Sequence, residues 1–316
     1  MMKKTLVALA AVAATGGAFA QATLTGGIAY GYYSGTAGDG TTASGGGMDT
    51  STLTFTATED LGNGNSVTAF IATDGTSGRG ESMLMDNQEI TLKMSGVALN
   101  VGSSKGGDWM LGASGSATYY GLDGKILSSK TINEKVSISL PIASGLTFSY
   151  TVSGPDNYVT LGTGNGGSGD QSKHGYNLKY AAGALTLQAG YVGYTNNLGT
   201  DADSSNLSRV GGNYNLGVAK VGVAMDSLAY GGGGSRTRSV VAASTTLGSL
   251  NLNMSWASTS TTSSTLTQGT RTGYVLGASH DLSKRTSVYL NYGNYLSAVG
   301  DDQNTSFTAV TLAHSF

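Results

Sequence analysis

Apolar residues alternate with small or polar residues in segment after segment of this chain. In residues 22–33, for example, Ile28, Tyr30 and Tyr32 share one parity and small residues take the other. The alternation recurs in three further clear segments: 53–58, 146–152 and 250–256. A period of two predicts β-strands, and about ten residues is the length that a tilted strand needs to cross a bilayer. No helical period is sustained after residue 20.

The two ends of the chain favour a membrane barrel over a soluble β-sandwich, which the alternation alone does not exclude. Lys3 and Lys4 precede an uncharged run over residues 5–15, and Ala18-Phe19-Ala20 follows. These are the three parts of a secretory signal peptide, predicted to occupy residues 1–20. The mature chain, residues 21–316, then ends in an alternating strand that closes on Phe316.

Composition supports the same class. The chain has 50 Gly, 2 Pro, no Cys and 11% charged residues, which fits neither an ordinary soluble domain nor a disulfide-stapled one. No stretch after residue 20 has the roughly 18 apolar residues of a spanning helix, so a closed β-barrel is the solution that pairs every backbone polar group in a membrane. Loss of Lys3 and Lys4 takes the net charge from −2 to −4 (15 basic against 19 acidic residues). This slight charge indicates no nucleic-acid partner.

We predict an all-β fold, a transmembrane barrel of sixteen antiparallel strands, with short turns at one end and longer outer loops at the other. The predicted turns are 60–64, 95–96, 141–145, 182–183, 216–217, 247–249 and 281–284. The predicted outer loops, which composition alone also allows to be flexible linkers, are 38–47, 73–82, 154–169, 196–205, 231–235 and 258–269.

One connection, residues 104–127, is neither a short turn nor a featureless loop, and a connection of this length is usually functional. Its aromatic and charged residues are Lys105, Asp108, Trp109, Tyr119, Tyr120, Asp123 and Lys125. It either packs on the rim of the barrel or folds inward and narrows it.

Three motifs resemble the general porins of Gram-negative bacteria, of the betaproteobacterial and neisserial type. They are Thr58-Glu-Asp-Leu-Gly-Asn-Gly64, Leu276-Gly-Ala-Ser-His-Asp-Leu-Ser-Lys-Arg-Thr286 and Ala313-His-Ser-Phe316. The resemblance implies a homotrimer of sixteen-stranded barrels whose third outer loop folds inward as the constriction. Residues 105–125 would then form the eyelet, with Asp108 and Asp123 as acidic members. Phe316 would be the signal for the barrel-insertion machinery.

The chain departs from that family at two places on the wall. Residues 51–57 read Ser-Thr-Leu-Thr-Phe-Thr-Ala and residues 86–92 read Asp-Asn-Gln-Glu-Ile-Thr-Leu, where related porins carry basic residues. These losses argue against the strong anion selectivity that is common in the family.

Parity predicts which charged side chains face the lumen, because residues out of phase with the apolar face point to water. The predicted wall charges are Glu89, Lys93, Lys135, Lys179, Arg209, Lys220 and Arg271. Charges that line a pore set its ion preference, although each of these can also be a solvated side chain far from the narrow point. Glu134 is the exception, because it shares parity with Val136 and so faces outward.

The sequence therefore predicts an outer-membrane channel for passive diffusion of ions and small hydrophilic solutes, with weak charge selectivity. One alternative is a channel that prefers a sugar or an aromatic solute, with Trp109, Tyr119 and Tyr120 as a stacking surface. The other is a non-conducting structural barrel. No catalytic or cofactor motif is present, so neither an enzyme nor a cofactor is expected. Surface Ca²⁺ at Asp201 with Asp203, or at Asp301 with Asp302, is the less favoured interpretation of those loop acids.

Overall fold

The structure is a computed structural model that describes residues 21–74, 84–104, 108–122, 125–127, 133–154, 172–195, 204–263, 267–296 and 304–316. These residues form sixteen strands and one short helix. The first half comprises β1 (Gln21–Thr36), β2 (Thr42–Gly62), β3 (Asn65–Asp74), β4 (Leu84–Met94), β5 (Val97–Ser104), α2 (Trp109–Ser114), β6 (Asn133–Ala143), β7 (Leu146–Gly154) and β8 (Lys173–Ala182). The second half comprises β9 (Leu185–Tyr194), β10 (Ser204–Asn215), β11 (Lys220–Tyr230), β12 (Ser235–Leu247), β13 (Leu250–Thr262), β14 (Gly269–Asp281), β15 (Thr286–Tyr295) and β16 (Thr305–Ser315).

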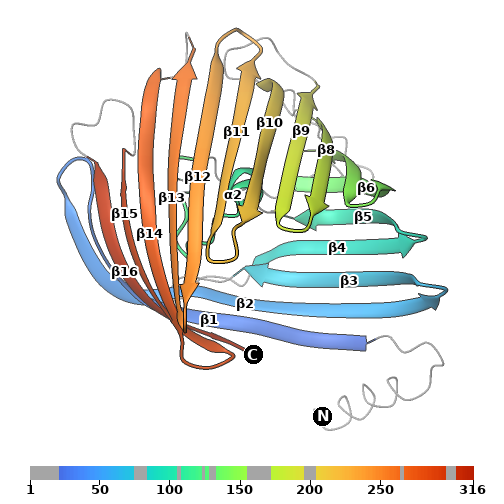
Figure 1. Ribbon diagram of the computed structural model, residues 1–316, viewed down its shortest axis with the longest axis horizontal. Coiled ribbons are helices and arrows are strands. Elements are labelled where there is room, and N and C mark those ends of the chain that lie inside the picture. The colour runs from blue at the N-terminus through green and yellow to red at the C-terminus, as the bar shows by residue number, and fades with distance from the viewer. Residues whose placement is uncertain are drawn as a thin grey trace.

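Each strand pairs antiparallel with its neighbours in the chain, and β1 pairs with β16, which closes the sheet into a barrel (Figure 1). The closing register runs from Gly27 opposite Ser315 to Thr36 opposite Ser306. Closure leaves no unpaired sheet edge. The predicted sixteen-stranded antiparallel barrel is thus confirmed. The described residues include no helix of the length and apolarity that crossing a membrane requires.

Short turns join the strands at the end of the barrel where Gln21 and Phe316 also lie, and the longer connections are at the other end. The two left-handed non-glycine residues among the described ones, Asn63 (φ 55°) and Ser95 (φ 50°), are in these short turns. Each precedes a glycine that also has positive φ, Gly64 or Gly96. Two successive positive φ angles match the right-handed twist of a hairpin, so the turn sequences fix the pairing register of β2 with β3 and of β4 with β5.

The two faces of the strands differ as parity predicts. Large apolar side chains are exposed on the outer face, with Tyr30 at 56%, Val223 at 55% and Leu312 at 50% of their surface accessible. Ala224 and Thr311, which lie on the opposite face, are 1% and 0% exposed. An outer apolar surface around a polar lumen is the arrangement that a bilayer stabilises.

Two predicted outer loops overlap strands. The predicted loop at 258–269 is wrong at its start, because β13 runs to Thr262 and residues 258–262 pair with β12. The predicted loop at 38–47 is wrong over most of its length. Residues 38–47 were expected to form a loop from their glycines, but β2 begins at Thr42 and its glycines pair with β1, with Gly46 opposite Tyr32. Only residues 37–41 connect the two strands. The reason is packing across the strands: a Cβ on Gly46 would lie 2.8 Å from the Tyr30 hydroxyl, so an aromatic side chain of β1 covers the space above this glycine.

Several expectations fall outside the described residues. These are the signal peptide over residues 1–20 and most of the outer loops at 73–82, 154–169 and 196–205. They stay predictions.

Candidate functional site in the barrel lumen

The long connection between β5 and β6 leads away from the strands that it joins. Its helix α2 contacts β9, β10, β11 and β12, on a different part of the wall, and Figure 1 shows α2 within the ring of strands. Asp108 caps the helix by accepting a hydrogen bond from Leu111 N at 3.0 Å. Gly115 ends it with a left-handed φ of 69°. The two caps define where this short helix begins and ends.

α2 lies in close contact with the inner face of the wall. Asn213 Nδ2 on β10 donates to Ala113 O at 3.0 Å. A Cβ on Gly222 of β11 would lie only 1.9 Å from Ser114 O. A side chain at this position would therefore displace the backbone of the helix, so glycine is needed here for the contact.

Apolar packing holds the connection in place. Met110, Leu122 and Ile126 are almost fully buried, in one cluster with Val275 and Phe307 of the wall. Burying side chains of this size contributes roughly 1.5–3 kcal/mol each. The described part of the connection is therefore bound to the inner wall by its own core.

Trp109, at the start of α2, contacts two strands. Its Nε1 donates to Asn177 Oδ1 of β8 at 3.2 Å, and its ring lies 5.0 Å from the guanidinium carbon of Arg209 on β10. Such a distance is typical of a cation–π contact. The predicted loop aromatic and the predicted wall arginine are thus brought together.

Tyr119 and Tyr120 contact a different part of the wall. Their hydroxyls donate to the carboxylate of Asp49 on β2, at 2.9 and 2.8 Å, and Tyr120 also lies 3.3 Å from Thr311 Oγ1 on β16. Burial, with the carboxylate of Asp49 as a further cause, raises the pKa of Tyr120 to about 12 and that of Tyr119 further. Both hydroxyls therefore stay protonated and donate at neutral pH.

Asp49 was missed by the sequence reasoning. It lies at a β-bulge, where the pairing of β2 with β1 shifts between Ala29 and Tyr30. A bulge adds one unpaired residue and redirects a side chain, so parity cannot be carried across it. The adjacent pair Tyr119-Tyr120 was the only signal in the sequence, and it does not identify its acceptor.

Glu89 and Lys135, both predicted wall charges, form an ion pair with Lys135 Nζ 2.6 Å from Glu89 Oε1. Asn100 Nδ2 donates to Glu89 Oε2 at 2.8 Å, and Lys135 Nζ donates to Ser104 Oγ at 2.6 Å. The two charges largely cancel at this place on the wall.

A second group of charges forms one lateral row across five strands. Successive cross-strand partners, from β10 to β14, are Arg209, Asp226, Arg238, Thr259 and Arg271. Arg238 Nε donates to Asp226 Oδ1 at 2.8 Å, and its Nη2 also contacts that carboxylate. With three guanidinium groups and one carboxylate, the row is net positive.

The connection runs along this same row. The ring of Trp109 stacks on the guanidinium of Arg209. Farther along the row, Ile126 O accepts a hydrogen bond from Thr259 Oγ1 at 2.6 Å. Lys125 O accepts one from Arg271 Nη1 at 3.4 Å. Asp108 interacts electrostatically with Arg209 and Arg238. The basic row and the connection therefore face each other at one level of the barrel.

Asp226 and Arg238 were not among the predicted wall residues, and neither was Arg236. Parity could have found all three, because Asp226 is six residues from Lys220 on β11, and Arg236 and Arg238 are out of phase with the exposed Val241 on β12. The rule was available in the sequence but was not applied to these three residues.

Of the remaining predicted wall residues, Lys220 lies beside the end of α2. Its Nζ would lie 2.8 Å from a Cβ on Gly115 at the end of α2. Lys93 is next to the turn at Ser95 and pairs with Ser66, and Lys179 on β8 pairs with Thr147 and Gln188. Lys125 Nζ donates to Gly121 O at 3.1 Å and lies 5.4 Å from the centroid of the Phe307 ring.

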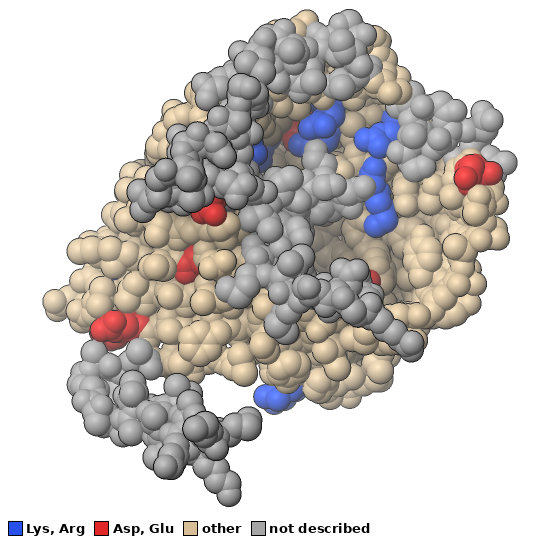
Figure 2. Space-filling view, turned by 180° about the vertical axis from the view of Figure 1, so that it is seen from behind, with Lys and Arg blue, Asp and Glu red and all other residues tan. Residues whose placement is uncertain are grey.

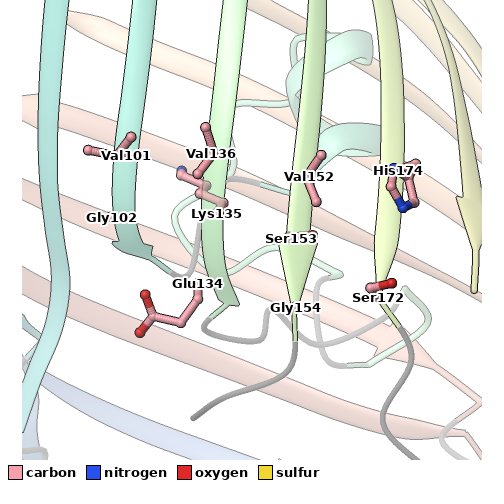
Figure 3. A pocket seen from close by; sticks show the side chains of 10 residues that line it. All are labelled: Val101, Gly102, Glu134, Lys135, Val136, Val152, Ser153, Gly154, Ser172 and His174. Atoms are coloured by element: carbon pink, nitrogen blue, oxygen red, sulfur yellow. The ribbon is translucent and has the colours of Figure 1, made fainter. Parts of the chain in front are cut away.

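Glu134 is the second residue of β6, at the end of the barrel that carries the longer connections. It lines a groove of about 380 Å³ with Val136, Val152 and His174 (Figure 3). Val136 is 51% exposed, which places this part of the groove on the outer face. A position at the end of a strand accounts for an outward carboxylate, because charge is tolerated near the membrane interface.

Six residues of the sequence predictions lie outside the part of the chain that the structure describes. They are Lys105, Asp123, and the four loop acids Asp201, Asp203, Asp301 and Asp302. Within the part of the chain that the structure describes, no three His, Asp or Glu side chains gather as a metal site would require. Phe316 exchanges backbone hydrogen bonds with Gly26, at 2.9 and 3.0 Å, and its role in membrane insertion stays a prediction.

Figure 2 shows Lys and Arg side chains gathered in the hollowed part of one face, whereas most of the surrounding surface is uncharged. Charge inside and apolar surface outside define a membrane barrel whose interior is open to polar solutes. These features define the class of protein as an outer-membrane channel.

Comparison with known proteins agrees. Residues 5–298 match the model of the Gram-negative porin family, and the chain belongs to that family. No curated protein matches the chain. Membership of the porin family means that this protein lies in the outer membrane and forms a channel for passive diffusion of solutes.

Solved structures share the fold at low sequence identity. The anion-selective porin from Comamonas acidovorans is 17% identical with a TM-score of 0.71, over 94% of this chain and 100% of that one. The outer membrane channel DcaP of Acinetobacter baumannii is 11% identical with a TM-score of 0.73, over 94% and 97%. The trimer form of OmpT from Vibrio cholerae is 14% identical with a TM-score of 0.69, over 94% and 99%.

Proposed function

We propose that this porin is a general diffusion channel whose narrowest part lies between the connection at residues 104–127 and the basic row on β10–β14. The contact of Trp109 with Arg209 and Asn177 carries the proposal, because it fixes the connection against strands far from its attachment at β5 and β6. A segment held across the lumen limits the size of solutes, and the charges beside it filter ions.

The balance of charge at this level favours anions. Arg209, Arg238 and Arg271 face the connection with Asp226 as the one acid in the row, while Glu89 is neutralised by Lys135. The wall charges that are usual in related porins are absent from β2 and β4, but basic groups on β10–β14 offset the loss. The selectivity for anions should be modest, since Asp49 and Asp108 also lie in the lumen.

We propose that three copies of this chain, each forming one barrel, assemble into a homotrimer. The apolar outer face is compatible with lipid and with a neighbouring subunit, and the OmpT relative of the same fold has a trimer form. A continuous aromatic surface on which sugars stack finds less support. Trp109 contacts β8 and β10 whereas Tyr120 contacts β2 and β16, so the aromatic side chains lie against separate parts of the wall.

The test is conductance of the refolded protein in a planar bilayer under a KCl gradient. We expect steps in groups of three and a small reversal potential of the sign for anions. A variant in which residues 109–122 are replaced by a short Gly-Ser linker should conduct more per channel. A silent bilayer from folded protein would favour the non-conducting barrel, and unchanged conductance in the linker variant would contradict the constriction.

A further inference from the structure

The lumen contains a pocket beside the contact of Trp109 with Arg209. It has a volume of about 280 Å³, and among its lining residues are Thr151, Lys173, Asn177, Val192, Leu207 and Arg209. Among the described residues that line it, none is acidic. The pocket lies on β7–β10, next to the level of the connection.

Arg209 differs from Arg238 in how its guanidinium group is held. The buried Nε of Arg209 has no hydrogen-bond partner among the described residues, whereas Arg238, two strands away, donates to Asp226. The Arg209 guanidinium instead lies against the Trp109 ring at 5.0 Å. Because stacking on its face leaves the terminal amino groups of a guanidinium able to donate, this geometry suits charge-assisted binding of an oxyanion.

A glycine gives Arg209 its position. Gly190 is the direct partner of Arg209 on β9, and a Cβ there would lie 3.1 Å from Arg209 Nε and 3.4 Å from Asn177 Oδ1. The Arg209 side chain therefore lies across the neighbouring strand, beside the Asn177 side chain that accepts from Trp109. The cationic part of the pocket is organised by Trp109, Asn177 and Gly190 together.

Another part of the pocket is apolar. Val192 and Leu207 line it, and they form an inner-face cluster with Leu228 and Tyr230. Apolar side chains on the lumen face of a porin wall are not needed for passage of water and salt. A binding site with an apolar wall and a few convergent polar groups fits an amphipathic small molecule.

We propose that this pocket binds a small organic anion, a carboxylate carried on a compact apolar body. The carboxylate lies on Arg209, with Lys173 adding positive charge, and the hydrocarbon lies against Val192 and Leu207. The inference rests on the proposed function for the route by which the solute reaches the pocket. It adds a preferred solute class to a channel that otherwise discriminates by size and charge.

The chain carries 2 Trp residues, so the variant Trp256→Phe leaves Trp109 as the single reporter, in direct contact with Arg209. We would titrate the refolded variant in detergent with cyclohexanecarboxylate and follow tryptophan emission. Acetate supplies the charge without the apolar body, and cyclohexylmethanol supplies the body without the charge. We expect a saturable response to cyclohexanecarboxylate, a weaker one to acetate and none to the alcohol.

In the same background, Arg209→Gln should weaken binding by about tenfold or more, since it removes a charge-assisted hydrogen bond. Arg285→Gln, which changes an exposed turn arginine, should not. Gly190→Ala displaces Arg209 without removing its charge and should weaken binding too. This variant distinguishes the position of Arg209 from an effect of net charge alone. An equal response to the alcohol, or unchanged affinity in both Arg209→Gln and Gly190→Ala, would overturn the proposal.

Conductance in KCl separates this inference from the proposed function. Protein that conducts KCl but gives no carboxylate-specific response contradicts the pocket and leaves the channel intact. Protein that binds the carboxylate but does not conduct supports the pocket and contradicts the diffusion channel.

Discussion

Lys135 Nζ lies 2.6 Å from Glu89 Oε1, so two charges that parity assigns separately to the wall form one ion pair. Their side chains are 22% and 12% exposed, and a pair with this access to water contributes at most about 1 kcal/mol to stability. The relationship therefore matters more for the field in the lumen than for folding.

The first prediction concerns this pair. Lys135→Gln should move the reversal potential toward cations because it leaves Glu89 uncompensated, and Glu89→Gln should move it toward anions. The double variant should return close to the unchanged protein, as two neutralised partners leave no net charge. Reversal potentials in planar bilayers under a KCl gradient measure all three. Single variants that leave the reversal potential unchanged would show that the pair lies away from the ion path.

The second prediction concerns Asp226 and Arg238, which are 3% and 8% exposed. Asp226→Asn should destabilise the barrel by about 3–5 kcal/mol, because it leaves a buried guanidinium without its carboxylate. The double variant Asp226→Leu with Arg238→Met should be close to neutral in stability, since it removes both charges. Urea unfolding in lipid vesicles measures the difference. Equal destabilisation by the single and double variants would contradict the buried-pair argument.

The sequence predicted the barrel well because strand parity is a local property. The alternation around Ile28, Tyr30 and Tyr32 needed no tertiary information, and these residues are exposed on the outer face as expected. Turn chemistry at Asn63 and Ser95 is equally local. Where glycines form a strand, as at Gly46, composition misleads because the side chain of Tyr30 on β1 supplies the packing.

The lumen could be predicted only in part. Arg209 was found by parity, but its contact with Trp109 joins residues 100 positions apart in sequence, as does the hydrogen bond from Asn213 to Ala113. Asp49 was out of reach because a bulge breaks the alternation at that point. Long-range pairing between a connection and the wall depends on closure of the barrel, which no local pattern encodes.

The third prediction concerns alkaline pH. Tyrosine in an unfolded chain ionises near pH 10, and burial raises the pKa of Tyr120 to about 12. A raised pKa means that the stabilisation is fully present below about pH 10 and is lost as the pH rises toward 12, when a phenolate faces the carboxylate of Asp49. The connection should therefore become mobile at high pH.

Ultraviolet absorbance of tyrosine ionisation tests this prediction. Tyr120→Phe should remove a late titration step and lower stability by roughly 1.5–3 kcal/mol, the usual value of a hydrogen bond to a charged group. Asp49→Asn should move the Tyr120 step to lower pH, because it removes a negative charge beside the hydroxyl. A late step that persists in Tyr120→Phe and is insensitive to Asp49→Asn belongs to other tyrosines.

The fourth prediction concerns the position of α2. A Cβ at Gly222 would lie 1.9 Å from Ser114 O, so Gly222→Ala should displace the helix from β11 while the strand, whose backbone pairing is unchanged, still forms. If α2 and its connection narrow the lumen, this variant should show altered single-channel conductance and more current noise in KCl. Ser227→Ala, a change of one small side chain on the outer face of the same strand, is the matched control and should behave like the unchanged protein. A Gly222→Ala channel with unaltered conductance and noise would mean that the contact between Ser114 and β11 does not set the width of the pore.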